Sequence, residues 1–170
     1  NQDGDNNVAI GACALDANTT ADNNTAVGTL SLSTNTTGTQ NTAVGHNSLN
    51  ATTTGGCNVA VGNCALLVNT IGCQNSAFGS GTMRCNTTGN CNVAIGRQAL
   101  FANTTASNNT AVGHQAMVTN TVGFDNAAFG KHALCLLQDG DYNTAIGAGS
   151  MAKTTTGNRN TAVGNNSLIC

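Results

Sequence analysis

Apolar and polar positions recur along this chain with a period of 17 residues. With residue 1 at position 1 of the repeat, position 9 is alanine and position 11 is glycine in every copy, Gly11 to Gly164. Position 10 is always Val, Ile or Phe, and position 15 is always Leu or Met. No insertion or deletion breaks the register, so we expect residues 1–170 to form a single repeat domain of ten copies, with no capping repeats evident.

The length and composition of the repeat predict its fold class. Seventeen residues cannot hold two helices and a turn, and the frequent glycine, threonine, asparagine and valine favour strands and turns. One coil of a parallel solenoid does fit this length. We therefore predict an all-β fold, a parallel β-solenoid (β-roll) with ten coils of 17 residues each. Coils spaced by one strand separation of ~4.8 Å would make a rod roughly 48 Å long.

Residues at one position stack into columns in such a fold. The apolar columns at positions 10 and 15 are expected inside. The two copies with phenylalanine at position 10, Phe78 and Phe129, have small residues two positions earlier, Ser76 and Ala127, which indicates a shared packed space. The invariant alanine predicts a contact too close for larger side chains. Glycine at position 11 indicates a positive φ or a close approach, and glycine or alanine at position 4 closes a Thr-Thr-Gly turn.

Position 7 is asparagine in all ten copies. Stacked asparagine side chains stabilise parallel strands because each amide bonds to the next. We predict a structural ladder formed by Asn7, Asn24, Asn41, Asn58, Asn75, Asn92, Asn109, Asn126, Asn143 and Asn160.

The charge of the chain is low and excludes some partners. Charged residues make up 7% of the chain, the net charge is −2, and the five basic residues are scattered along the sequence. This pattern does not predict nucleic-acid binding or attraction to anionic lipid. No apolar run is long enough for membrane insertion.

No group of residues predicts catalysis or a cofactor. His46 and His114 share a column but stand four coils apart, and His132 is in the next column, without a nucleophile or carboxylate placed beside any of them. Asp3-Gly4-Asp5 and Asp139-Gly140-Asp141 have a composition that could bind Ca²⁺, but they lie in coils far apart and are read as plain turns. We expect a protein that is not an enzyme and holds no metal.

Eight cysteines suggest an oxidising, extracellular setting. The solenoid allows pairing only between residues of one coil or of adjacent coils. Candidate disulfides are therefore Cys57 or Cys91 with Cys73, and Cys85 with Cys91. The alternative is that several cysteines are small buried apolar residues.

Asn-x-Ser/Thr sequons suggest N-glycosylation of a surface protein. Four of them share position 1, just before the Thr-Thr turn, and are expected to project from the surface. The candidates are Asn18, Asn23, Asn35, Asn50, Asn86, Asn103, Asn108 and Asn165.

The five-residue segments 7–11, 58–62 and 92–96, of the form Asn-Val-Ala-(Ile/Val)-Gly, resemble the head repeats of YadA-like trimeric autotransporter adhesins. Related Asn-Thr-Ala-Val-Gly arrays resemble parts of phage and giant-virus fibres. The resemblance implies a left-handed β-roll, a lateral trimer and a place on a cell or virion surface. The 17-residue period departs from the shorter coil of the adhesin heads, and the chain contains no coiled-coil stalk or membrane anchor.

The two ends allow two interpretations, head-to-tail stacking of chains or a segment of a longer array of the same repeat. The tenth repeat ends where the first would resume the period, and an uncapped solenoid end is an open sheet edge. We expect a structural subunit of an extracellular filament or fibre, a homopolymer assembled by head-to-tail stacking of coils. One alternative is an adhesin or viral fibre shaft that binds a host surface or glycan. The other is an ice-binding solenoid, because Thr-Thr pairs at positions 2 and 3 form regular rows.

Overall fold

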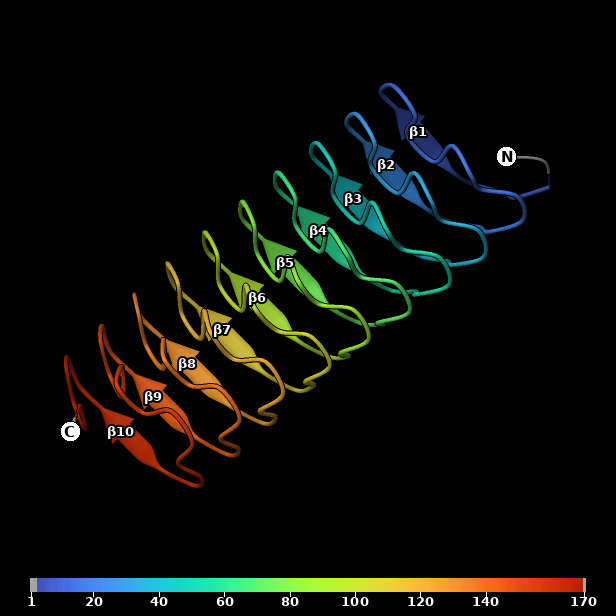
Figure 1. Cartoon of the computed structure of the whole chain (residues 1–170). Coiled ribbons are helices and arrows are strands. Elements are labelled where there is room, and N and C mark those ends of the chain that lie inside the picture. The colour runs from blue at the N-terminus through green and yellow to red at the C-terminus, as the bar shows by residue number, and fades with distance from the viewer. Residues whose placement is uncertain (1–2, 170) are drawn as a thin grey trace.

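The computed structural model describes residues 3–169, which form a parallel β-solenoid (Figure 1). Each coil contributes one short strand to a single ten-stranded sheet, and the two ends of the chain lie at opposite ends of the rod. The predicted fold class is confirmed. The strands are β1 (Val8–Ile10), β2 (Thr25–Val27), β3 (Thr42–Val44), β4 (Val59–Val61), β5 (Ser76–Phe78), β6 (Val93–Ile95), β7 (Thr110–Val112), β8 (Ala127–Phe129), β9 (Thr144–Ile146) and β10 (Thr161–Val163).

Neighbouring strands pair in parallel with a register of one repeat, so that Ala26 lies beside Ala43 and Ala43 beside Ala60. Backbone hydrogen bonds continue outside the strands. The N–H of position 13 donates to the carbonyl of position 12 in the preceding coil, as from Leu30 to Ala12. The N–H of position 15 donates to position 14 of the following coil, as from Leu32 to Ser48. Coils are thus joined around much of their circumference, although only three residues of each are strand.

The interior holds one large apolar side chain in most coils, and the ninth coil adds Leu137 at position 1. Leucine or methionine at position 15 is fully buried from Leu32 to Met151, beside alanine at position 9 and small residues at position 14. The other buried columns are polar: asparagine at position 7 and, in most coils, at position 1. The solenoid therefore has a narrow core in which amide groups occupy two columns and large apolar side chains occupy one.

The expectation that position 10 lies inside is wrong. Side chains alternate sides along a strand, and alanine at position 9 is the residue that points inward. Positions 8 and 10 therefore face outward together, with Phe78 and Phe129 each 41% exposed and Ile95 43% exposed. The small residues Ser76 and Ala127 are neighbours of the phenylalanines on this outer surface, not in the core.

Glycine at position 11 has both of the properties expected of it. Gly62 has a φ of +140°, and a Cβ added there would lie 2.5 Å from the carbonyl oxygen of Gly79 in the next coil. A side chain would therefore strain the backbone and also push the stacked coils apart.

Candidate functional site

The asparagines at position 7 form a continuous ladder through the interior. At each of nine steps the backbone N–H of one asparagine donates to the Oδ1 of the asparagine in the preceding coil, at 2.9–3.1 Å. The Nδ2 group donates to the position 4 carbonyl of the following coil at 2.6–2.9 Å. Each asparagine from Asn24 to Asn143 thereby bonds to the preceding coil through its backbone N–H and to the following coil through its side chain, so the ladder has a structural role.

A second ladder lies where surface glycans were expected. Asn18, Asn35, Asn86 and Asn103 at position 1 are at most 2% exposed, so the prediction that they project from a surface turn is wrong. Asn103 Nδ2 donates to Asn86 Oδ1 at 2.7 Å and to the Ala106 carbonyl at 3.0 Å. An attached sugar would have no space in this fold. Of the other sequons, Asn23, Asn108 and Asn165 are exposed and Asn50 is half-buried.

Two interruptions of this second ladder leave polar atoms without partners. Position 1 is Thr52 in the fourth coil and Leu137 in the ninth. The asparagines one coil before them, Asn35 and Asn120, have no hydrogen-bond partner for Oδ1, and Thr52 has none for its buried hydroxyl. Where the ladder is intact, the Oδ1 atom accepts from Nδ2 of the position 1 asparagine in the following coil, and Asn35 and Asn120 lack this donor.

The threonine pairs do not present two matching rows of free hydroxyls. At position 2 the hydroxyl donates to the position 2 carbonyl of the following coil, as from Thr70 to Thr87 at 3.0 Å. Only position 3 is outward and free, and there Asp3, Ile71, Val122 and Asp139 interrupt the threonines. The ice-binding alternative requires a regular array of free threonine hydroxyls, and the structure has only one interrupted row of them.

The seven cysteines that the structure describes are free thiols. The candidate disulfides among Cys57, Cys73, Cys85 and Cys91 are not formed; Cys57 and Cys91 instead approach Gln40 and Gln74 in the coils that precede them, at 3.1 and 3.2 Å. Burial raises the pKa of the Cys135 thiol. Cys170 lies outside the described residues.

Aspartates at position 5, which include Asp141 of the second Asp-Gly-Asp turn, accept the position 5 N–H of the preceding coil. Asp141 Oδ1 accepts the N–H of Phe124 at 3.0 Å, and Asp22 Oδ1 accepts the N–H of Asp5 at 2.7 Å. Among residues 3–169 no group of three or more His, Cys, Asp or Glu side chains is placed to hold a metal ion. No helix formed by these residues could cross a membrane.

Two of the three histidines lie together. The rings of His114 and His132 are 5.6 Å apart, and His132 bonds to Gln115 at 3.1 Å. Partial burial, followed by the charges of Lys131 and His114, lowers the pKa of His132. The sequence placed these histidines in different columns, and their contact follows from the small sideways offset between positions 12 and 13 of adjacent coils.

One candidate surface is the outer face of the sheet, which we call the apolar face and define as positions 8 and 10 of all coils. Its residues are Val, Ile, Phe, Thr, Ser and Ala, without a single charged residue. Exposed members include Ile10, Phe78, Ile95, Phe129 and Ile146, each at least 41% exposed. A contiguous exposed apolar surface of this kind is typical of a protein–protein interface.

The two end strands form a second candidate surface because their hydrogen bonding is directional. From the first coil to the ninth, the N–H of position 8 donates to the position 7 carbonyl of the following coil at 2.8 Å. The N–H of position 11 donates to the position 10 carbonyl of the preceding coil at 2.7–2.8 Å. The Thr161 N–H and the Val163 carbonyl of β10 therefore face outward along the rod, as do the Asn7 carbonyl and the Gly11 N–H beside β1.

Side chains that are buried elsewhere are exposed at these ends. Leu168 is 53% exposed although position 15 is fully buried in most other coils, and Ala9 is exposed although alanines at position 9 are otherwise buried. A further coil at either end would cover them. Comparisons of the chain with protein-family models, curated proteins and solved structures found no match.

Proposed function

We propose that this protein is a structural subunit of an extracellular filament, in which coils of successive copies stack head to tail. The observation that carries the proposal is the complementarity of the two end strands. Placing the tenth coil of one copy against the first coil of another would pair the Thr161 N–H with the Asn7 carbonyl. It would also pair the Gly11 N–H with the Val163 carbonyl, in the register used within the chain.

The side chains at such a joint support the same arrangement. Asn160 at the end of the position 7 ladder would present its Oδ1 to the Asn7 N–H, as asparagines do at the nine internal steps. Leu168 would be covered as the other position 15 side chains are. Open strand edges associate readily unless they are blocked, and neither β1 nor β10 carries a charged side chain or a proline that would block it.

A proline at the edge tests head-to-tail stacking without disturbing the coil. The Thr161 N–H has no partner to lose within the chain, so Thr161→Pro removes only the donor that would join two copies. We expect wild-type protein to form filaments visible by negative-stain electron microscopy and to sediment as polymers. Thr161→Pro should remain as short rods with unchanged thermal stability, and Thr161→Ser should still polymerise.

Two results would contradict the proposal. One is wild-type protein that stays as single rods at high concentration, and the other is Thr161→Pro protein that polymerises like wild type.

The fibre-shaft alternative is favoured by a different observation, the apolar face. A single rod leaves this face open to water along its whole length, and a second copy is a suitable occupant because it carries the same uncharged surface with the same coil spacing. Parallel copies packed through this face would form a bundle, as the resemblance to trimeric adhesin heads also implies. Changing Ile95 and Phe129 to Lys should reduce the rod mass measured by light scattering to that of one chain. An unchanged mass would exclude the bundle.

A further inference from the structure

The charged residues are unevenly distributed along the rod. All acidic residues lie in the first two coils or from Asp125 onward, and residues 23–124 contain none. Arg84 and Arg97 lie in the fifth and sixth coils, so neither has a carboxylate in its own coil or in an adjoining one. Both side chains are exposed. The middle of the rod therefore carries unpaired positive charge although the chain as a whole is negative.

The fold gathers these two arginines with Lys131 and two histidines on one side of the rod. We define the basic stripe as Arg84, Arg97, His114, Lys131 and His132, which occupy positions 12, 13 and 16 of coils five to eight. Arg97 Nη1 lies 3.4 Å from His114 Nε2, and the rings of His114 and His132 are 5.6 Å apart. Position 12 holds Arg97, His114 and Lys131 in three successive coils, so the outer two are roughly 10 Å apart. The stripe is straight because one coil follows another along the axis.

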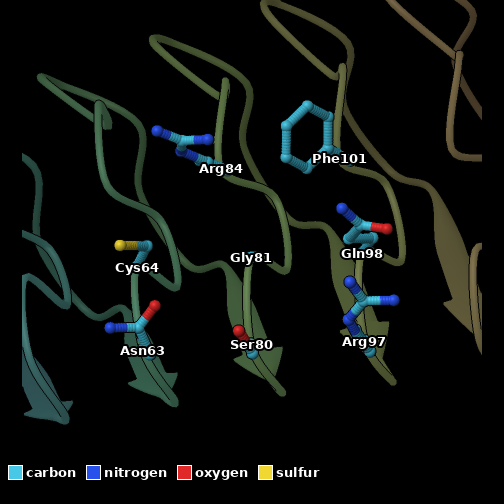
Figure 2. A pocket seen from close by; sticks show the side chains of 8 residues that line it. All are labelled: Asn63, Cys64, Ser80, Gly81, Arg84, Arg97, Gln98 and Phe101. Atoms are coloured by element: carbon cyan, nitrogen blue, oxygen red, sulfur yellow. The ribbon is translucent and has the colours of Figure 1, made fainter.

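A hollow of about 210 Å³ lies at the Arg84 end of the stripe. It exists because position 13 is Gly81 in the fifth coil, whereas the neighbouring coils have the side chains of Cys64 and Gln98 there. Figure 2 shows Gly81 among the surrounding side chains of three adjacent coils. A Cβ at Gly81 would meet only ordinary contacts, at 3.5 Å or more, so the missing side chain leaves usable space.

The lining of the hollow combines charge with neutral hydrogen-bonding groups. Arg84 and Arg97 supply guanidinium groups, and Asn63, Ser80 and Gln98 supply amides and a hydroxyl (Figure 2). The Arg84 guanidinium lies over the Phe101 ring, 5.9 Å from its centroid, which holds the side chain at the rim. Guanidinium groups bind sulfate and carboxylate groups with paired hydrogen bonds. Amides and hydroxyls bind the hydroxyls of a sugar.

We propose that the basic stripe and its hollow bind a linear acidic polysaccharide, with a sulfated or carboxylated sugar in the hollow and the chain along the rod. The straight row of Arg97, His114 and Lys131 suits a linear polyanion. A nucleic acid fits less well because single strands are bound through several aromatic side chains, and Phe101 is the only aromatic ring at the hollow. The proposal does not depend on filament formation, because all its residues lie in five coils of one chain.

The test measures binding of a fluorescent heparin-type octasaccharide to the full chain by polarisation, at about 0.15 M salt. We expect saturable binding that weakens as salt rises. The double variant Arg84→Gln, Arg97→Gln should bind about 100-fold more weakly, since each charged hydrogen-bonding group contributes about tenfold. The matched control is Lys153→Gln, Arg159→Gln, which removes two charges outside the stripe and should leave the affinity unchanged.

Gly81→Gln separates the hollow from the charge. Glutamine already occupies this column at Gln98 and Gln115 with φ values of 58° and 55°, close to the 67° of Gly81, so the variant should fold normally. It keeps both arginines but fills the space, and we expect at least a tenfold loss of affinity. Thermal melting of each variant checks that the fold is intact.

Several outcomes would overturn the proposal. Absence of binding by the wild-type chain would do so, as would an equal loss in the two double variants, which would indicate general charge attraction. Unchanged affinity in Gly81→Gln would remove the hollow from the site. Equal or tighter binding of a thymidine oligonucleotide of the same charge would replace the polysaccharide with a nucleic acid.

Discussion

Three columns of this chain have backbone conformations that restrict which residues can stand there. Positions 6, 13 and 15 have φ values of about +50° to +67° in every coil. Side chains branched at Cβ are strongly disfavoured in this left-handed region. None of the thirty residues in these columns is Val, Ile or Thr, although the chain is rich in all three. This explains why the interior column uses Leu and Met whereas the strand uses Val and Ile.

Leu66 offers a direct test of this restriction. It is fully buried with a φ of 51°. Leu66→Ile conserves volume but places a β-branched residue in the left-handed region, and it should lower the free energy of unfolding by about 2 kcal/mol. Leu66→Met should change it far less, because Met83 and Met117 already occupy the column. Chemical denaturation of both variants measures the difference, and equal effects would refute the backbone explanation.

Thr52 interrupts the second ladder, formed by the position 1 asparagines, and a substitution there can restore it. Thr52→Asn would supply a donor to Asn35 Oδ1 and an acceptor for Asn69 Nδ2, as at the uninterrupted steps. We expect a gain of about 1 kcal/mol for the restored bonds, which corresponds to a rise in Tm of roughly 2–4 °C. Thr52→Val removes the buried hydroxyl but restores no bond to Asn35. If Thr52→Asn and Thr52→Val have the same Tm, the restored ladder bonds do not cause the gain in stability.

His132 should make stability depend on pH. Its pKa is lowered in the folded chain by burial and by Lys131 and His114, so the unfolded chain binds the proton more readily. The stabilisation is therefore complete above the ordinary histidine pKa of about 6.5 and is lost as pH falls below it. His132→Gln continues the Gln98–Gln115 column and should reduce the fall in Tm between pH 7.5 and 5.5. An unchanged pH dependence would show that other groups cause it.

At the scale of the element, the asparagine ladders join the coils in addition to the three-residue strands. Asn75 illustrates this, because its backbone N–H and its side-chain amide bond to Asn58, Gly89 and Asn92 in the coils on both sides. Asn75→Ala would leave the Asn92 N–H buried without a partner and would remove one of the two donors to the Gly89 carbonyl, the other being Asn86 Nδ2. It should cost about 2 kcal/mol. Asn165→Ala, at an exposed position, is the control and should be neutral. Thermal unfolding distinguishes the two, and a small effect at Asn75 would contradict a structural ladder.

The repeat predicted the fold class and the position 7 ladder, because residues that are identical every 17 positions lie next to one another in adjacent coils. It did not predict which side of the strand faces inward. Apolar character suggested position 10, but the strand alternates sides, and the inward residue is the invariant alanine. The clue was available: Ala9 and its equivalents never vary, whereas position 10 ranges from Val to Phe. A closely packed interior tolerates less variation in size than an outer face does.

The candidate sites were harder to predict because they depend on the path of the chain between strands. The position 1 asparagines read as surface sequons, yet the turn directs them inward, where they form the second ladder. The basic residues seemed scattered because Arg84, Arg97 and Lys131 are separated by 13 and then 34 residues. Winding with a 17-residue coil places them on one side of the rod.

At the scale of the whole molecule, the rod has one internal repeat and two exposed surfaces that the same chain could cover. The end strands favour growth along the axis, and the apolar face favours association across it. These two contacts are independent, because one uses backbone hydrogen bonds of the end coils and the other uses side chains at positions 8 and 10. A filament several chains wide would use both.

The most direct test of the central claim, head-to-tail stacking, is cryo-electron microscopy of assemblies formed by the purified chain. Stacking predicts filaments with an axial repeat of ~4.8 Å that continues across the joint between copies, with the Thr161 backbone placed against Asn7 of the next copy. Rods of ten coils that end freely, or filaments whose coil spacing is interrupted at each joint, would contradict it.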